Sequence, residues 1–298
     1  MRRIMGLLRL TRPANVITAV SDILAGIAIS GYFLNADEHL LKPVILLIIS
    51  TMGLYAGGVV FNDVFDAKLD AVERPERPIP SGIVSKKVAT VWGALLLTIG
   101  IIAAANVHEN VYSISAVLSV AIAACALVYD RWCKHHFIAG PLTMGLCRGL
   151  NLLLGISIIS VAVNTYWLLC LAPVVYIAAI TTVSRGEVHG GNKTNLYLAV
   201  CLYTLVVATL LTFSIIQQHW QTAVFLIAGF CGMIMPPLIK AIKQPSGPLI
   251  GKAVKAGVLA LILMNAAWAA AFGQFYLACI IVLLLPLSIL LARLFAVT

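Results

Sequence analysis

Ten apolar stretches, each about 20 residues long, limit the fold of this chain more than any other feature of its sequence. An α-helix of that length crosses the hydrocarbon core of a bilayer. Hydrophobic residues make up 61% of the 298 residues and charged residues 10%, a balance that excludes a soluble domain of this size. We therefore predict an all-α polytopic membrane protein with nine to ten transmembrane helices. The stretches lie near residues 13–33, 43–62, 87–106, 111–129, 138–160, 165–183, 195–216, 220–240, 252–272 and 274–295.

Basic residues are distributed unevenly over the loops between these stretches. The net charge is +9, but Lys42 is the only Lys or Arg residue in the loops after odd-numbered stretches. Because Lys and Arg accumulate in cytoplasmic loops, the remaining loops and both termini are predicted to be cytoplasmic. The predicted location is the cell inner (plasma) membrane, with the chain in contact with the lipid bilayer. Since membrane topology accounts for the positive charge, we predict no nucleic-acid partner.

One polar segment, residues 62–82, separates the second and third apolar stretches. It reads NDVFDAKLDAVERPERPIPSG and holds five of the eleven acidic residues. Asn62, Asp66 and Asp70 recur every four residues, so on a helix they share one face about one turn apart. Such a row of hard oxygen ligands suits Mg²⁺, which binds few carboxylates and keeps room for substrate phosphates. The alternative is a charged connector between two membrane helices.

Two arginines, Arg74 and Arg77, follow this row directly. The prolines around them end the helix and hold both side chains on a stiff loop. Guanidinium groups beside a carboxylate-bound Mg²⁺ make a place for a diphosphate. The segment as a whole therefore indicates a Mg²⁺–diphosphate site.

Residues 62–82 resemble the first aspartate motif of the UbiA superfamily of intramembrane prenyltransferases, NDxxDxxxD followed by a basic, proline-rich element that ends in PSG. The segment LTRPAN at 10–15 resembles the part that leads into the family's first helix. Residues 140–151 resemble the EboC-type branch of the superfamily. The resemblance covers most of the chain and implies one UbiA-like transmembrane domain over 1–298. The family is usually described with nine spans, so a tenth is a departure.

The resemblance implies transfer of a prenyl group from a prenyl diphosphate to an unidentified small acceptor within the membrane, with Mg²⁺ as cofactor. It implies Asn62, Asp66 and Asp70 as metal ligands, Asp66 and Asp70 as catalytic residues, and Arg74 and Arg77 as substrate-binding residues.

Relatives contact the diphosphate with a tyrosine and a downstream lysine or arginine after the fourth span. Tyr129 and Lys134 match this pattern and are implied substrate-binding residues. Asp130 lies between them, and a pair between it and Arg131 or Lys134 is one alternative. The alternative for this segment is a solvated charge cluster.

A second polar loop, SRGEVHGGNK at 184–193, stands where relatives carry a second aspartate motif, and it contains no aspartate. Either Glu187 and Asn192 hold a weaker metal, or Arg185 and Lys193 contact the diphosphate directly. We predict Arg185 and Glu187 as catalytic residues, and Asn192 and Lys193 as substrate-binding residues. The missing aspartates favour an alternative function, a non-catalytic protein that binds or transports a lipid phosphate.

The two halves of the chain show a faint internal repeat. In each half a polar loop follows the second apolar stretch, at 62–82 and at 184–193. Two half-bundles that face each other bring both loops over one central cavity. We therefore predict four-helix half-bundles at about 10–130 and 138–242 around that cavity, with extra C-terminal spans at 252–295.

Arg148 is a cation that falls well inside an apolar stretch. A charge at membrane depth is costly and usually faces a cavity or a partner. Asn151 follows three residues later on the same helical face. We predict both as substrate-binding residues in a polar wall of the cavity. The alternative is an ion pair between Arg148 and Asp22, the other charge well inside a stretch.

Overall fold

The computed structural model describes residues 2–34, 41–109, 113–185 and 193–295, and nearly all of them are helical. The elements are α1 (Arg2–Leu10), α2 (Pro13–Ser30), α3 (Leu41–Phe65), α4 (Ala67–Glu73), α5 (Lys86–Ala105), α6 (Ile114–Val128), the π-helical turn η1 (Tyr129–Cys133), α7 (Ala139–Ile156), α8 (Ser160–Tyr166), the 3₁₀ turn η2 (Trp167–Cys170), α9 (Leu171–Ser184), α10 (Lys193–Ile216), α11 (Trp220–Lys243), α12 (Gly247–Ala271) and α13 (Phe275–Phe295).

Within these described ranges, ten helical segments are long and apolar enough to cross a membrane. This confirms the predicted all-α polytopic fold. Most of the predicted stretches agree with the observed segments to within a few residues. The largest differences are in the sixth span, which begins at Ser160 and runs through α8, η2 and α9, and in the ninth, which begins at Gly247. The chain is therefore a multi-span helical membrane protein.

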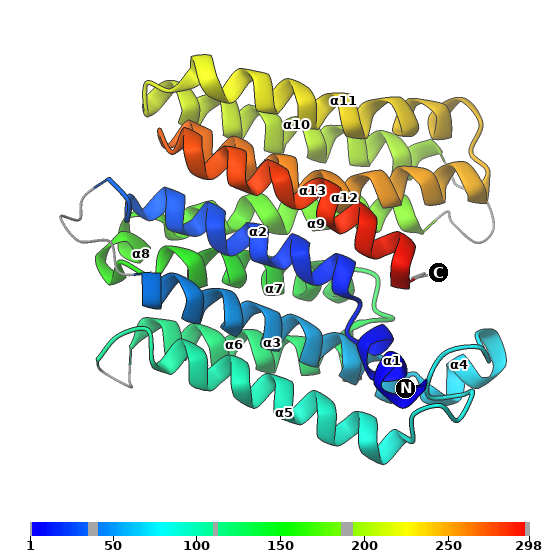
Figure 1. Cartoon of the computed structure of the whole chain (residues 1–298). Helices are drawn as coiled ribbons and strands as arrows, with labels where there is room; N and C mark the ends of the chain where they lie inside the picture. Colours follow the sequence, from blue (N-terminus) through cyan, green and yellow to red (C-terminus); the bar gives the residue numbers. More distant parts are fainter. Residues whose placement is uncertain (1, 35–40, 110–112, 186–192, 296–298) are drawn as a thin grey trace.

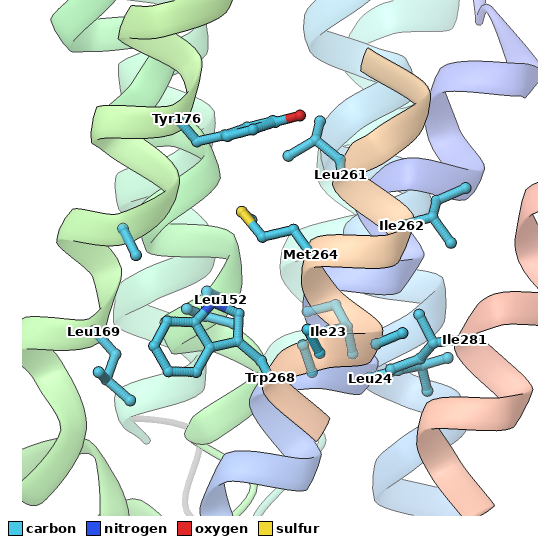
Figure 2. Close-up of a cluster of buried hydrophobic side chains, with 14 of the residues drawn as sticks. Ile23, Leu24, Leu152, Leu169, Tyr176, Leu261, Ile262, Met264, Trp268 and Ile281 are labelled. Atoms are coloured by element: carbon cyan, nitrogen blue, oxygen red, sulfur yellow. The ribbon is translucent and has the colours of Figure 1, made fainter. Parts of the chain in front are cut away.

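The spanning helices lie side by side in one bundle, with α2 in its interior (Figure 1). Helix α2 packs against α3 and α7 on one side and against α12 and α13 on the other. Figure 2 shows the resulting core, in which Ile23 of α2, Leu152 of α7 and Trp268 of α12 are fully buried. The C-terminal helices therefore share a core with the first spanning helix. The predicted half-bundle boundaries stay a prediction.

Helices α2 and α7 approach each other closely because two glycines face each other at their crossing. A Cβ atom added to Gly26 would collide with the carbonyl oxygen of Leu152, and one added to Gly155 would collide with that of Ile23. Small residues allow membrane helices to pack backbone against backbone in this way. The crossing brings the polar side chains of α2 and α7 into direct contact.

The short helix α1 lies across the end of the bundle where α4 also lies (Figure 1). Its buried residues, Gly6 and Leu10, pack against Ile83 and Val84 in the loop before α5. Helical spacing puts its exposed arginines on the same side as these two residues, while Ile4, Met5 and Leu8 form an exposed apolar face. A helix with one apolar and one cationic face suits the interface between lipid and water.

Candidate active site

A cavity of about 640 Å³ opens between α3, α4, α6 and α7 and the start of α2. Most of the predicted site residues line it, namely Asn62, Asp66, Asp70, Arg74, Arg77, Tyr129, Lys134, Arg148 and Asn151. These residues come from three separate parts of the chain, at 62–77, 129–134 and 148–151. The fold therefore gathers them around one space.

The row of oxygen ligands lies at a break between two helices. Helix α3 ends at Phe65 and α4 begins at Ala67, so Asp66 stands between them. The backbone keeps its helical spacing across the break, because Asp66 N donates to Asn62 O at 3.0 Å and Asp70 N donates to Asp66 O at 2.8 Å. All three side chains line the cavity. The predicted common face is therefore preserved through the break.

Cations pair with the acids at this end of the cavity. Lys134 forms an ion pair with Asp66, and Arg77 lies 2.8 Å from Asp70. Arg77 also lies 3.3 Å from Asp63, a carboxylate that is nearly inaccessible behind the row. Each predicted carboxylate ligand thus has a basic partner, so the site combines groups that attract a cation with groups that attract an anion.

Arg12 is a cavity residue that the sequence analysis did not assign. It adopts a left-handed conformation with φ 47°, between α1 and α2. Its Nη2 lies 2.8 Å from Asp63 Oδ1, and its side chain lines the cavity. Pro13 follows it and disfavours a helical conformation at the preceding residue. The Arg12-Pro13 pair at the start of the first apolar stretch was the sequence feature that could have indicated this residue.

Asp130 is a second unassigned cavity residue. It belongs to the π-helical turn η1, is 9% exposed and accepts a hydrogen bond of 2.6 Å from Asn62 Nδ2. The alternative pair with Arg131 or Lys134 is not formed among the described side chains, since Lys134 contacts Asp66 instead. A helix break of this kind carries no clear mark in the sequence, although π-helical turns are frequent at functional sites.

The inner end of the cavity is polar, although it lies at membrane depth. Arg148 Nη1 lies 2.8 Å from Asp22 Oδ2, and Arg148 Nη2 donates to Thr18 Oγ1 at 2.7 Å. Asn151 and Asn265 also donate to Asp22, at 3.1 and 2.7 Å. Arg148 therefore pairs with Asp22 and also lines the cavity, and its role in substrate binding stays a prediction.

The second polar loop contributes fewer described residues. Arg185 donates to the carbonyl oxygen of Phe137, and its guanidinium carbon lies 3.7 Å from the centroid of the Phe137 ring. Lys193 is exposed at the start of α10. Neither lines the cavity. Glu187 and Asn192 lie outside the described residues. The roles assigned to these four residues stay predictions.

The sequence matches the UbiA prenyltransferase family over residues 24–254. The chain belongs to this family. A digeranylgeranylglyceryl phosphate synthase from Methanothrix thermoacetophila is 30% identical over 151 residues, which cover 51% of this chain and 54% of that protein. The chain spans about half the length of the first curated relatives that it matches. The assignment to the EboC-type branch stays a prediction.

Two solved structures share the UbiA-type fold. One comes from work on digeranylgeranylglyceryl phosphate synthase in membranes, with a TM-score of 0.67, 23% identity and coverage of 91% of this chain and 99% of the other. The second is a UbiA homologue from Archaeoglobus fulgidus bound to DMAPP and Mg²⁺, with a TM-score of 0.61, 17% identity and coverage of 90% and 99%. At these identities the likeness establishes the fold.

Proposed function

We propose that the protein is an intramembrane prenyltransferase that transfers a prenyl group from a prenyl diphosphate to a small acceptor. The observation that carries this proposal is the cavity itself. One end gathers the row of Asn62, Asp66 and Asp70 with the cations Arg77 and Lys134, and apolar side chains line part of the walls between this end and the polar inner end. A molecule with a diphosphate head and a hydrocarbon tail matches both parts.

The row fits Mg²⁺ by the chemistry of its donors. Asn62, Asp66 and Asp70 place three hard oxygen ligands along one wall. Among the described residues, no three His, Cys, Asp or Glu side chains form a closed metal site. Mg²⁺ is usually bound through one or two carboxylates and substrate phosphates rather than by an all-protein cage. When bound, it would supply positive charge to the departing diphosphate.

Basic side chains around the row are proposed to bind the diphosphate. Arg12, Arg74, Arg77 and Lys134 all line the cavity, so several charge-assisted hydrogen bonds to phosphate oxygens are available. In the reaction, the allylic C–O bond breaks and its electron pair leaves with the diphosphate. The basic groups stabilise that charge as it develops.

The prenyl chain is proposed to lie against the apolar walls. Leu54 and Val59 of α3, Ile122 and Ala126 of α6, and Met144 of α7 line this part. They keep water away from the electron-poor allylic carbon, which water would otherwise capture. The carbon is then available to an acceptor oxygen, which forms the new C–O bond and loses its proton.

For the acceptor we propose a lipid glyceryl phosphate that already carries one geranylgeranyl chain. The support is the name of the matched relatives, digeranylgeranylglyceryl phosphate synthase. The free glyceryl hydroxyl would be the attacking oxygen. The number of basic residues at the cavity is compatible with two phosphate-bearing substrates.

We also propose that the protein lies in the plasma membrane with both termini and the row of oxygen ligands at the cytoplasmic side. The support is the clustering of basic residues in loops after even-numbered spans. In Figure 1 α1 and the C-terminal end of α13 lie at the end of the bundle where α4 lies. A water-soluble diphosphate head would then enter from the cytoplasm.

A product assay tests the function. Purified protein in detergent is incubated with geranylgeranyl diphosphate, Mg²⁺ and either geranylgeranylglyceryl phosphate or an aromatic acid, and products are identified by mass spectrometry. We expect the digeranylgeranyl ether from the first acceptor only. Transfer to the aromatic acid alone would overturn the proposed acceptor. Diphosphate binding without transfer to any acceptor would favour the non-catalytic lipid-phosphate binder.

Lys134→Met tests the diphosphate-binding role of the lysine. The change removes a charged donor at the cavity, so we expect the affinity for a geranylgeranyl thiodiphosphate analogue to fall about 10- to 100-fold. Isothermal titration calorimetry in the presence of Mg²⁺ measures it. Lys68→Met is the matched control, because Lys68 is exposed on α4 and does not line the cavity. Equal affinities in the two variants would contradict the assigned role.

A further inference from the structure

The contact between Asn62 and Asp130 joins the row of oxygen ligands to the turn η1 in the cavity wall. Asn62 lies near the end of α3 and Asp130 in η1, 68 residues apart, and Asn62 Nδ2 lies 2.6 Å from Asp130 Oδ1. Both side chains line the cavity. The contact therefore lies within the site and directly at one of the proposed Mg²⁺ ligands.

The chemistry of this contact fixes the orientation of the amide group. Asn62 Nδ2 donates to Asp130 Oδ1, so the amide nitrogen of Asn62 faces Asp130. The carbonyl oxygen Oδ1, the only metal-binding atom of the amide, is then left on the other side. Without Asp130, the amide group would be free to turn and present its nitrogen to a cation.

Asp130 is available for this contact because of its local structure. The π-helical turn places it in the cavity wall, and the turn closes with a 2.9 Å hydrogen bond from Lys134 N to Tyr129 O. The nearby Lys134 side chain is paired with Asp66. No described cation lies within ion-pair distance of the Asp130 carboxylate, so none competes with Asn62 for this carboxylate.

We propose that Asp130 is a positioning residue that orients the Asn62 carbonyl oxygen toward the divalent cation. This inference rests on the proposed function of the cavity. Hydrogen-bond partners of metal ligands fix ligand orientation, and their loss typically lowers metal affinity 10- to 100-fold. Asp130 thus supports the site from the turn η1.

Mn²⁺ binding tests the inference without any need for turnover. Free Mn²⁺ is followed by electron paramagnetic resonance while it is titrated into protein saturated with the thiodiphosphate analogue. We expect Asp130→Leu to weaken Mn²⁺ binding about 10- to 100-fold. Asp130→Asn keeps a carbonyl oxygen that can accept from Asn62, so its loss should stay below about tenfold. Equal losses in both variants would indicate a direct ligand and overturn the positioning role.

Rescue gives the sharper test. A carboxylate at position 62 presents an oxygen from either side, so Asn62→Asp in the Asp130→Leu background should return most of the lost Mn²⁺ affinity. Glu76→Leu removes an exposed acid that does not line the cavity and should leave binding within about twofold of wild type. If wild type binds Mn²⁺ but Asn62→Asp does not restore the affinity lost in Asp130→Leu, the inference is overturned and the proposed function is not. Absence of wild-type binding would overturn the proposed function together with the inference.

Discussion

Asp66→Asn is expected to lower the rate of Mg²⁺-dependent prenyl transfer by at least about 100-fold. Asp66 lies at the break between α3 and α4, lines the cavity and pairs with Lys134. The substitution keeps the size of the side chain but removes the charge that would attract the cation and hold the lysine. The rate is measured as product formed from geranylgeranyl diphosphate under saturating acceptor.

The matched control for this loss is Glu76→Gln. Glu76 belongs to the same polar segment, but it is exposed and does not line the cavity. We expect its rate to stay within about twofold of wild type, because a distant surface charge adds little. A comparable loss in the two variants would mean that the general charge of the segment, rather than the position of Asp66, supports the reaction.

Asp22→Ala is expected to destabilise the protein by about 3–5 kcal/mol, because it leaves the Arg148 guanidinium buried without its countercharge. Asp22 is inaccessible and accepts hydrogen bonds from Arg148, Asn151 and Asn265. Loss of this one side chain therefore affects α2, α7 and α12 together. The free energy of unfolding is measured by denaturant titration in detergent micelles.

A double variant separates the charge effect from the loss of packing. Adding Arg148→Met to Asp22→Ala removes the unpaired charge and keeps an unbranched side chain of similar length. We expect the double variant to be more stable than Asp22→Ala alone, since residues in direct contact do not have additive effects. Additive losses would show that the ion pair is not what makes Asp22 important.

The spanning helices and the row of oxygen ligands could be predicted because both depend on local sequence. Membrane spans follow from the length of apolar stretches, and Asn62, Asp66 and Asp70 share a face through helical spacing alone. That spacing survived even the helix break at Asp66. The sixth span began earlier than predicted because α8 and η2 continue the helical path before α9.

The missed parts of the site depend on contacts between distant segments. Arg12 reaches Asp63 across 51 residues, and Asn265 reaches Asp22 across 243. No local pattern indicates such pairs in a single sequence. The contact of Asp130 is harder still to predict from the sequence. Asp130 lies in a π-helical turn and contacts the distant Asn62 rather than a nearby cation. These contacts required the packing of α2, α3, α6 and α12 to be known.

The most direct test of the account is Mg²⁺-dependent binding of a geranylgeranyl thiodiphosphate analogue to purified protein in detergent. Wild type and Asp66→Ala are titrated by calorimetry with Mg²⁺ and with EDTA. We predict binding by wild type that requires Mg²⁺ and is lost in Asp66→Ala. Wild-type binding that is unaffected by both EDTA and Asp66→Ala, or no binding at all, would contradict a Mg²⁺–diphosphate site in this cavity.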